Sequence, residues 1–240
     1  MKNAVTKKIL PAAAWLIIWQ LLAIVIHNKI LIAGPIETVE ALIRLVGTQI
    51  FWESIENSCI RILSGFLAGV ILGSVLAFAS YEKPWVGDFL KPLVLALKAV
   101  PVASFVILLL IGFGNRNIST IICAIVVFPI MYLNVHEGLT SADPKLMEMA
   151  EVYRIPTTRR LRYIFFPQLK PFIRSGVKLA IGMSFKSGIA AEVIGQPLKT
   201  MGNGLYEAKI YLETGDLFAW TIVIVLISFI CEKILVRLFK

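Results

Sequence analysis

Two ionisable residues, Lys186 and Glu192, lie deep in an apolar segment that extends from about residue 172 to residue 194. An ionisable side chain at membrane depth costs about 2.5 kcal/mol or more, so it normally faces a bundle interior or a wet cavity. Six residues separate the two, and they therefore do not share a face of one regular helix. Lys186 is either half of a structural ion pair or a pathway residue that attracts an anionic solute. For Glu192 we favour a structural role near the outer end of the segment.

The remaining chemistry-bearing residues form no recognisable catalytic or metal site in the sequence. His27 and His136 are isolated near the ends of apolar segments, with no accompanying serine and carboxylate pattern. Three cysteines, odd in number, are far apart and lack metal-ligand spacing: Cys59, Cys123 and Cys231. No phosphate-binding loop of the form GxxxxGK[ST] is present. We predict no catalytic residue and no metal, and ATP hydrolysis, where it is needed, in another chain.

The composition places these residues in a membrane protein. The chain is 58% hydrophobic, with a mean hydropathy of +0.82, whereas soluble chains average about 45–50% apolar residues. A membrane span needs roughly 20 mainly apolar residues. We therefore predict an all-α integral membrane protein, a single domain over residues 1–240 with about six transmembrane helices. The expected spans are about 9–26, 59–80, 93–113, 118–135, 172–194 and 218–235.

The charge distribution predicts the orientation of the chain. The net charge is +9, which in a membrane protein indicates basic cytoplasmic loops rather than nucleic-acid binding. Placing both termini, the loop 81–92 and the region 136–175 inside collects most of the basic residues. The N-terminal apolar run is longer than a usual signal peptide and lacks a cleavage site, so we interpret it as a first span. We expect a multi-pass protein of a bacterial-type cytoplasmic (inner) membrane with both termini cytoplasmic.

Small residues and one proline predict how the spans pack. In two segments small residues recur every fourth position, which lets helices approach closely in lipid. These rows are Gly65, Gly69, Gly73 and Ala77, and Gly176, Ala180, Ser184 and Gly188. Pro101 predicts a kink in the third span and a freed carbonyl group. The kink either is structural or lines a pathway, because broken helices in membranes occur where backbone faces a cavity or protein.

The longest polar stretch, within the expected cytoplasmic loop 136–171, predicts two short helices. Asp143 can cap a first helix, and Pro144 suits its first position. The apolar stripe of this helix is Leu146, Met149, Ala150 and Tyr153. Ile155-Pro156 breaks it, because the residue before proline avoids the α region. A second, basic helix then runs toward Pro167. Such a structured knob between spans predicts a partner that receives it.

The residues of this knob carry a family resemblance. Glu148-Met149-Ala150, Arg154 and Ile164-Phe165-Phe166-Pro167 resemble the EAA signature of ABC importer permeases. That signature has Glu-Ala-Ala, three residues, Gly, nine residues, Ile, one residue and Leu-Pro, and the spacing here matches throughout. Arg154 replaces the glycine. Asp143-Pro144 and Ala190-Ala191-Glu192 also resemble the nitrate, sulfonate and taurine branch of these permeases.

The resemblance implies the fold of a type I ABC importer permease and a set of partners. Two copies of the permease, here a homodimer, would form the pathway within membrane lipids. Two ATP-binding cassette subunits, which bind ATP and Mg, would each receive one knob as a coupling helix. An extracytoplasmic binding protein would deliver a small solute such as a sulfonate, nitrate, taurine or a vitamin precursor. The resemblance assigns the coupling contact to Leu146, Glu148, Met149, Ala150, Tyr153 and Arg154. The candidate pathway residues are Lys186, Glu192 and Pro101.

An alternative function is compatible with the same residues. The chain could be an ATP-independent membrane enzyme or channel component that uses Lys186 and Glu192. This alternative predicts polar groups that face each other at one depth, and it leaves the cytoplasmic knob without a role.

Overall fold

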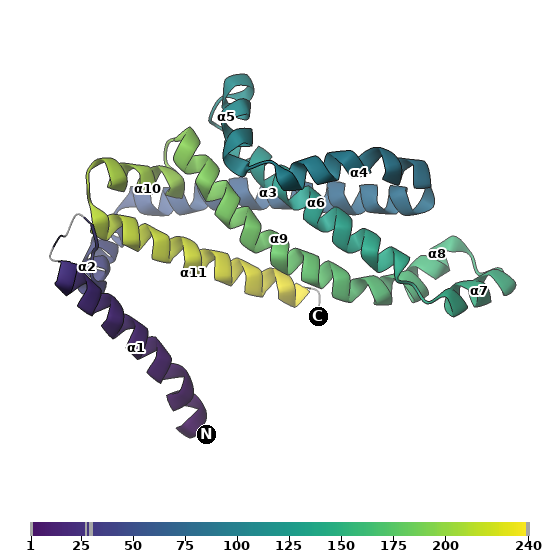
Figure 1. Ribbon diagram of the computed structural model, residues 1–240, viewed down its shortest axis with the longest axis horizontal. Coiled ribbons are helices and arrows are strands. Elements are labelled where there is room, and N and C mark those ends of the chain that lie inside the picture. The colour runs from purple at the N-terminus through teal and green to yellow at the C-terminus, as the bar shows by residue number, and fades with distance from the viewer. Residues whose placement is uncertain (1, 27, 29–30, 239–240) are drawn as a thin grey trace. The chain divides into compact units, whose positions relative to one another are not determined.

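The computed structural model describes residues 2–26, 28 and 31–238, and every regular element in these ranges is a helix (Figure 1). His27 lies outside the described residues. The chain divides into two compact units, which are described separately. One unit comprises Met1–Asn57 and Gln196–Val225, and the other comprises Ser58–Gly195 and Leu226–Lys240. The prediction of an all-α protein is confirmed.

The first unit combines the N-terminal helices with two helical segments from the last quarter of the sequence. It contains α1 (Lys2–Ile26), α2 (Pro35–Val46), the start of α3 (Gln49–Glu82), α10 (Met201–Ile210) and the first half of α11 (Thr214–Leu238). At the start of α2, the Gly34 N–H donates to Glu37 Oε2 over 3.2 Å, which is the glutamate half of a capping box. An ion pair between Arg44 and Asp216 joins α2 to the first turn of α11.

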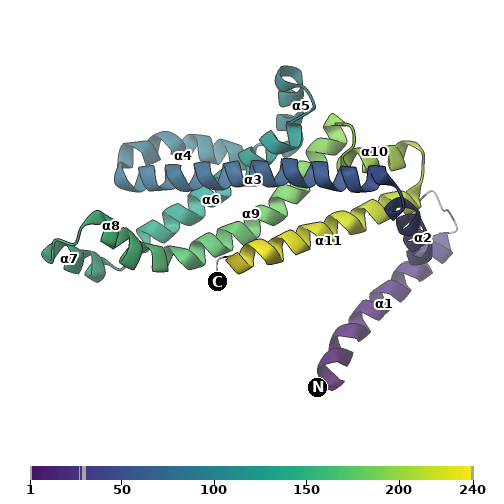
Figure 2. The same ribbon diagram turned by 180° about the vertical axis from the view of Figure 1, so that it is seen from behind.

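The second unit is built around one buried helix. It contains the rest of α3, α4 (Pro84–Ala99), α5 (Val102–Phe113), α6 (Ile118–Thr140), α7 (Pro144–Val152), α8 (Thr157–Arg160), the π-helical turn η1 (Leu161–Phe165), α9 (Phe166–Gly195) and the end of α11. Buried side chains recur along the whole of α6, because α3 and α9 both pack against it (Figures 1 and 2).

The small-residue rows are where these helices approach one another. A Cβ added at Gly65 would lie 2.2 Å from the Thr120 carbonyl oxygen, and one added at Gly69 would lie 2.6 Å from Val127 Cβ. No side chain fits there, so α3 and α6 meet backbone to backbone. On α9, a Cβ at Gly188 would lie 2.7 Å from Ile62 of α3. The packing role predicted from the spacing is confirmed.

The third predicted span is broken rather than kinked. Helix α4 ends at Ala99 and α5 begins at Val102, and their axes differ by 103°. The prediction of one helix over 93–113 is wrong, because Val100, which precedes Pro101, is extended (φ −74°, ψ 131°) as residues before proline prefer. The predicted loop 81–92 is also wrong. Helix α4 already starts at Pro84, a favoured first helical position, and only Lys83 separates it from α3.

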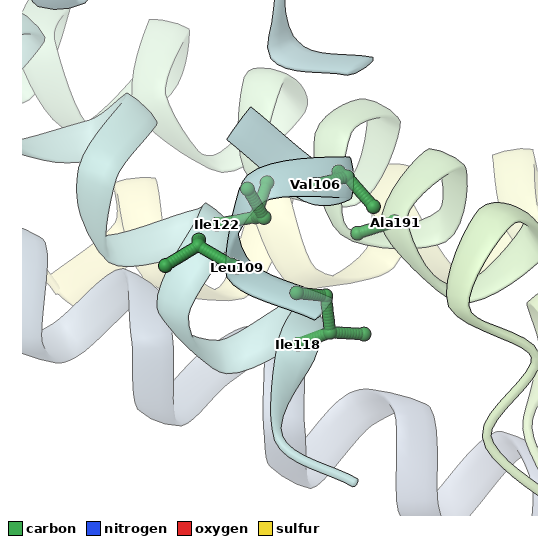
Figure 3. Close-up of a cluster of buried hydrophobic side chains, with 5 residues drawn as sticks. All are labelled: Val106, Leu109, Ile118, Ile122 and Ala191. Atoms are coloured by element: carbon green, nitrogen blue, oxygen red, sulfur yellow. The ribbon is translucent and has the colours of Figure 1, made fainter. Parts of the chain in front are cut away.

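Beyond the break, α5 is anchored by a small apolar cluster. Its Val106 and Leu109 pack against α6 and α9, as the side chains in Figure 3 show. The cluster consists of Val106, Leu109, Ile118, Ile122 and Ala191. Because Ala191 precedes Glu192, this cluster fixes α5 beside the part of α9 that carries the acidic candidate.

Length and apolarity identify several helices that could cross a membrane. Among the described residues, three qualify on their own: Gln49–Glu82, Ile118–Thr140 and Thr214–Arg237. The bent α4–α5 pair would be a fourth. Of the other two expected spans, 9–26 lies on α1 and 172–194 lies on α9, where Lys178, Lys186 and Glu192 interrupt the apolar sequence. The six-span count stays a prediction.

Candidate functional site

The polar knob begins with the predicted cap. Asp143 Oδ1 accepts a hydrogen bond from the Lys145 N–H over 2.9 Å, which satisfies one of the free amides of the first turn of α7. Pro144 occupies the first helical position. Both expectations for the start of the knob are confirmed.

The end of α7 turns through a left-handed residue. Arg154, at the position of the motif glycine, has φ +49°. The Ile155 N–H donates to the Ala150 carbonyl over 2.9 Å, and the Arg154 N–H donates to the Glu151 carbonyl over 3.0 Å. This pair of bonds is the Schellman motif, which normally places glycine at the left-handed position. The sharp turn of the family pattern is therefore kept, with an arginine in the strained conformation.

A second arginine fastens the two sides of the knob together. Arg160 Nε donates to the Ile155 carbonyl over 2.9 Å, and Arg160 Nη2 donates to the Ala150 carbonyl over 3.1 Å. The Ala150 carbonyl belongs to the last turn of α7, where intrahelical partners are missing, and the Ile155 carbonyl lies just beyond the helix end. The sequence analysis missed this role. The only sequence signal is a basic residue one turn beyond the Ile155-Pro156 break.

The second side of the knob is not a separate short helix. The elements α8, η1 and α9 follow one another without a gap from Thr157 to Gly195, so the expected helix end near Pro167 is wrong. A π-helical turn precedes Pro167, in the place where the proline removes a backbone donor. Ile164 and Phe165 of this turn are buried, and the Phe165 ring meets Tyr81 edge-on at 5.5 Å. The knob is thereby continuous with a buried helix of the unit.

The coupling residues assigned by resemblance divide into outward and inward side chains. Ala150 is fully buried, whereas Tyr153 is 75% exposed. Val152, which the sequence analysis did not single out, is 77% exposed. The exposed members of the assigned set are Leu146, Glu148, Met149, Tyr153 and Arg154. We call the exposed apolar group Leu146, Met149, Val152 and Tyr153 the knob face.

The candidate pathway residues occupy different environments. Glu192 is fully buried and accepts a hydrogen bond from Ser58 Oγ over 2.7 Å, as its expected structural role requires. Lys186 is exposed on α9, and Pro101 is exposed at the break between α4 and α5. Lys186 and Glu192 thus do not face each other as a catalytic pair would. Among the described side chains, no group of three histidine, cysteine or carboxylate residues could hold a metal ion.

A cavity of about 640 Å³ lies beside α4 and α6, within the range of roughly 300–1,000 Å³ that is typical of ligand sites. Its lining includes Lys91 and Lys98 of α4 and His136 of α6. The Tyr132 hydroxyl donates to Ser80 Oγ over 3.0 Å, and the imidazole of His136 stacks on the Tyr132 ring. The sequence pattern had indicated only His136, as an isolated residue. The lining also includes the carboxylate of Asp88 and apolar side chains.

Comparisons with known proteins agree on the type of chain. The sequence is 24% identical over 239 residues to the taurine transport system permease protein TauC of Escherichia coli strain K12, covering 97% of this chain and 86% of that protein. It is 24% identical over 224 residues to the Bacillus subtilis strain 168 protein assigned as an aliphatic sulfonates transport permease, SsuC, covering 92% of this chain and 81% of that one. It is 26% identical over 161 residues to the bicarbonate transport system permease protein CmpB of Synechococcus elongatus, covering 66% and 57%.

A solved structure and a family profile also match this chain. A crystal structure of an amino acid ABC transporter with histidines superimposes with a TM-score of 0.60 at 18% sequence identity, covering 79% of this chain and 91% of that one. The profile of the binding-protein-dependent transport system inner membrane component matches residues 69–240, more than half of the chain. The chain therefore belongs to the family of binding-protein-dependent transport system inner membrane components.

Proposed function

We propose that this chain is the permease subunit of an ATP-driven ABC importer, and that the knob is its coupling element. The observation that carries the proposal is the construction of the knob. It presents exposed apolar side chains on a short helix whose end is closed by backbone bonds and by Arg160. An exposed apolar group on a stiff support is the surface that a protein partner buries.

In this proposal the partner is an ATP-binding cassette subunit, one for each of two permease copies, and it binds ATP and Mg. Met149, Val152 and Tyr153 make the contact. Ala150 and Arg160 hold the helix end in shape, and Arg154 borders the contact. Movement of the partner reaches the membrane because η1 and α9 continue directly from the knob. A flexible knob would deform instead of transmitting this movement, and it could not shift the equilibrium between two conformations of the membrane helices.

The imported solute is proposed to be a small anion. Relatives of this chain carry names for the transport of taurine, aliphatic sulfonates and bicarbonate. The cavity beside α4 and α6 offers Lys91 and Lys98 to such a solute, against the single lining carboxylate of Asp88, together with apolar walls. A second permease copy completes the pathway, and an extracytoplasmic binding protein supplies the solute. Both termini and the knob lie in the cytoplasm.

Two basic residues are alternative contacts for the anion along the pathway. Lys98 lines the cavity, close in sequence to the break at Pro101, whereas Lys186 is exposed on α9. The variants Lys98→Ala and Lys186→Ala separate them in an uptake assay with a sulfonate. The variant that raises the uptake KM or loses anion selectivity identifies the contact, and an unchanged Lys186→Ala variant removes Lys186 from the pathway.

The coupling role is tested by purification of the tagged chain from its native membrane in mild detergent, followed by identification of the proteins that accompany it. The wild-type chain is expected to bring down a P-loop ATPase in stoichiometric amount. Tyr153→Asp should lose this ATPase, because it places a carboxylate in an apolar contact. Tyr211→Asp is a matched control, since Tyr211 is 72% exposed and also ends a helix.

The outcomes are distinct. Loss of the ATPase from Tyr153→Asp alone supports coupling through the knob. If both tyrosine variants keep the ATPase, the knob face is not the contact. If the wild-type chain emerges without an ATPase, the importer proposal fails.

A further inference from the structure

Two rows of basic side chains converge where α9 begins and α11 ends. On α9, Lys170, Arg174 and Lys178 follow one another at four-residue intervals and so share one face. On α11, Lys233 and Arg237 repeat the same spacing. The two helix ends lie side by side in both views (Figures 1 and 2), and both belong to the second unit.

The rows line one groove of about 790 Å³. We call it the basic groove; its charged lining residues are Lys170, Arg174, Lys178, Glu232, Lys233 and Arg237. Among the described residues of this lining, Glu232 is the only acidic one, and its carboxylate lies 3.9 Å from the Lys178 ammonium group. Like charges four residues apart on a helix destabilise it. The groove therefore concentrates positive charge that its own carboxylate does not balance.

An apolar surface of α11 adjoins the basic groove. The Lys233 ammonium group lies 4.8 Å from the centroid of the Phe229 ring, a cation–π contact. The neighbouring surface of α11 exposes Leu226, Phe229, Ile230 and Ile234, each by more than half. This part of α11 belongs to a helix apolar enough to cross a membrane. A ligand in the groove thus meets cations on one side and hydrocarbon on the other.

We propose that the basic groove binds the phosphate headgroup of an anionic phospholipid, whose acyl chains lie along the exposed apolar surface of α11. Basic pockets between transmembrane helices recognise such headgroups on the side of the membrane that carries anionic lipids. The depth of the rows fits this ligand, since the step from Lys170 to Lys178 along α9 is about 12 Å. Long basic side chains at different depths reach one headgroup plane by extending toward the interface.

Other occupants fit the groove less well. A second copy of this chain that docked with the same face would bring the same cations, and the two sets would repel each other. An acidic face of another protein would match the charge but would leave the adjacent apolar surface of α11 in contact with lipid. An amphiphile with one negative headgroup matches both surfaces, because its headgroup can bind in the basic groove while its acyl chains contact the apolar surface of α11. The inference concerns lipid binding and stands apart from the proposed transport function.

The test uses the purified full-length chain in a neutral detergent and the double variant Arg174→Gln/Lys233→Gln. The matched control is Lys83→Gln/Arg116→Gln, which removes one lysine and one arginine from exposed positions outside the groove. Apparent melting temperature is followed as phosphatidylglycerol is added, with phosphatidylcholine and inorganic phosphate in parallel. Native mass spectrometry counts the lipid molecules that stay bound.

Phosphatidylglycerol should raise the melting temperature of the wild type and the control, whereas phosphatidylcholine should not. The groove variant should need about 25-fold more phosphatidylglycerol, because each basic residue near an anionic surface contributes roughly a factor of five. Three results would overturn the proposal. They are an equal response of groove variant and control to phosphatidylglycerol, an equal effect of inorganic phosphate on the wild type, or stabilisation by phosphatidylcholine as strong as by phosphatidylglycerol.

Discussion

Two helix ends in this protein have the same local structure and different surroundings. Helix α7 ends in Ala150-Glu-Val-Tyr153, followed by left-handed Arg154; helix α10 ends in Ala208-Lys-Ile-Tyr211, followed by left-handed Leu212 (φ +49° and +58°). Ile155 and Glu213 donate to the carbonyls of Ala150 and Ala208, each over 2.9 Å. We call these the Tyr153 corner and the Tyr211 corner.

The shared features follow from local sequence. A small alanine three residues before the end is buried in each corner, by 100% and 96% of its surface, and the tyrosine beside it points outward. Two helices can thus turn sharply without glycine, at the strain cost of one left-handed residue. What separates the corners is the long-range partner. Arg160 closes the Tyr153 corner, whereas the Tyr211 corner is followed by Asp216, which pairs with Arg44.

The largest expected effect comes from filling the buried alanine positions. Ala150→Leu and Ala208→Leu each enlarge a buried alanine, and overpacking of a buried site costs about 1–3 kcal/mol. Ala208 also borders a cavity of about 450 Å³, so its variant should lie at the lower end of this range. The apparent melting temperature of both variants should fall. Only Ala150→Leu should also lose the co-purifying ATPase, because it displaces the knob face. If Ala208→Leu removed the ATPase equally, the two corners would not differ in function.

The next effect tests the side-chain contact that only the Tyr153 corner has. Arg160→Ala removes two hydrogen bonds from a charged donor to carbonyl groups, about 1–2 kcal/mol of local stability for a half-buried group. Hydrogen exchange of the α7 amides should accelerate, while that of the α10 amides should not change. Arg159→Ala is the control, since Arg159 is exposed and one residue away. Equal acceleration in both variants would indicate a loss of charge rather than of these bonds.

A smaller loss of stability is expected from removing the Arg44–Asp216 ion pair near the Tyr211 corner. Arg44→Gln removes the partner of the buried Asp216 carboxylate, but Arg44 itself is 63% exposed. Solvent therefore screens much of the attraction, and the loss should be below about 1 kcal/mol. Hydrogen exchange at the start of α11 should accelerate slightly and that of α7 should stay unchanged. A larger response at α7 than at α11 would contradict the separation of the two corners.

The sequence predicted what local rules determine. Helical periodicity, the Asp143 cap and the four-residue spacing of small residues were sufficient for the all-α fold, the start of the knob and the packing of α3 and α9 on α6. The spacing of the EAA signature was sufficient for the family. In each case the responsible residues are close in sequence, so their geometry follows from helix dimensions.

The features that the sequence did not reveal depend on residues distant in the chain or on backbone conformation. Nothing local indicates that Pro101 separates helices by 103° rather than kinking one helix, because the apolar cluster with Ala191 fixes the direction of α5. In the sequence, Ala150 is one residue of an apolar stripe. Its burial, in contrast to the exposure of the rest of the stripe, follows from the tertiary structure. The groove formed by α9 and α11 unites residues about 60 positions apart, which no motif connects.

The smallest expected effect is a gain, and it tests the strain that the corners share. Arg154→Gly and Leu212→Gly each relieve a left-handed non-glycine residue, worth about 1–2 kcal/mol, but glycine also loses roughly 0.5–1 kcal/mol through its greater freedom in the unfolded chain. Each variant should therefore gain about 0.5 kcal/mol, seen as slower hydrogen exchange of the Ile155 or Glu213 amide. Alanine at either position keeps the strain and should show no gain. If Arg154→Gly slowed exchange without weakening the ATPase contact, the arginine would be a tolerated replacement in the turn; a weakened contact would instead assign the guanidinium group to the edge of the coupling surface.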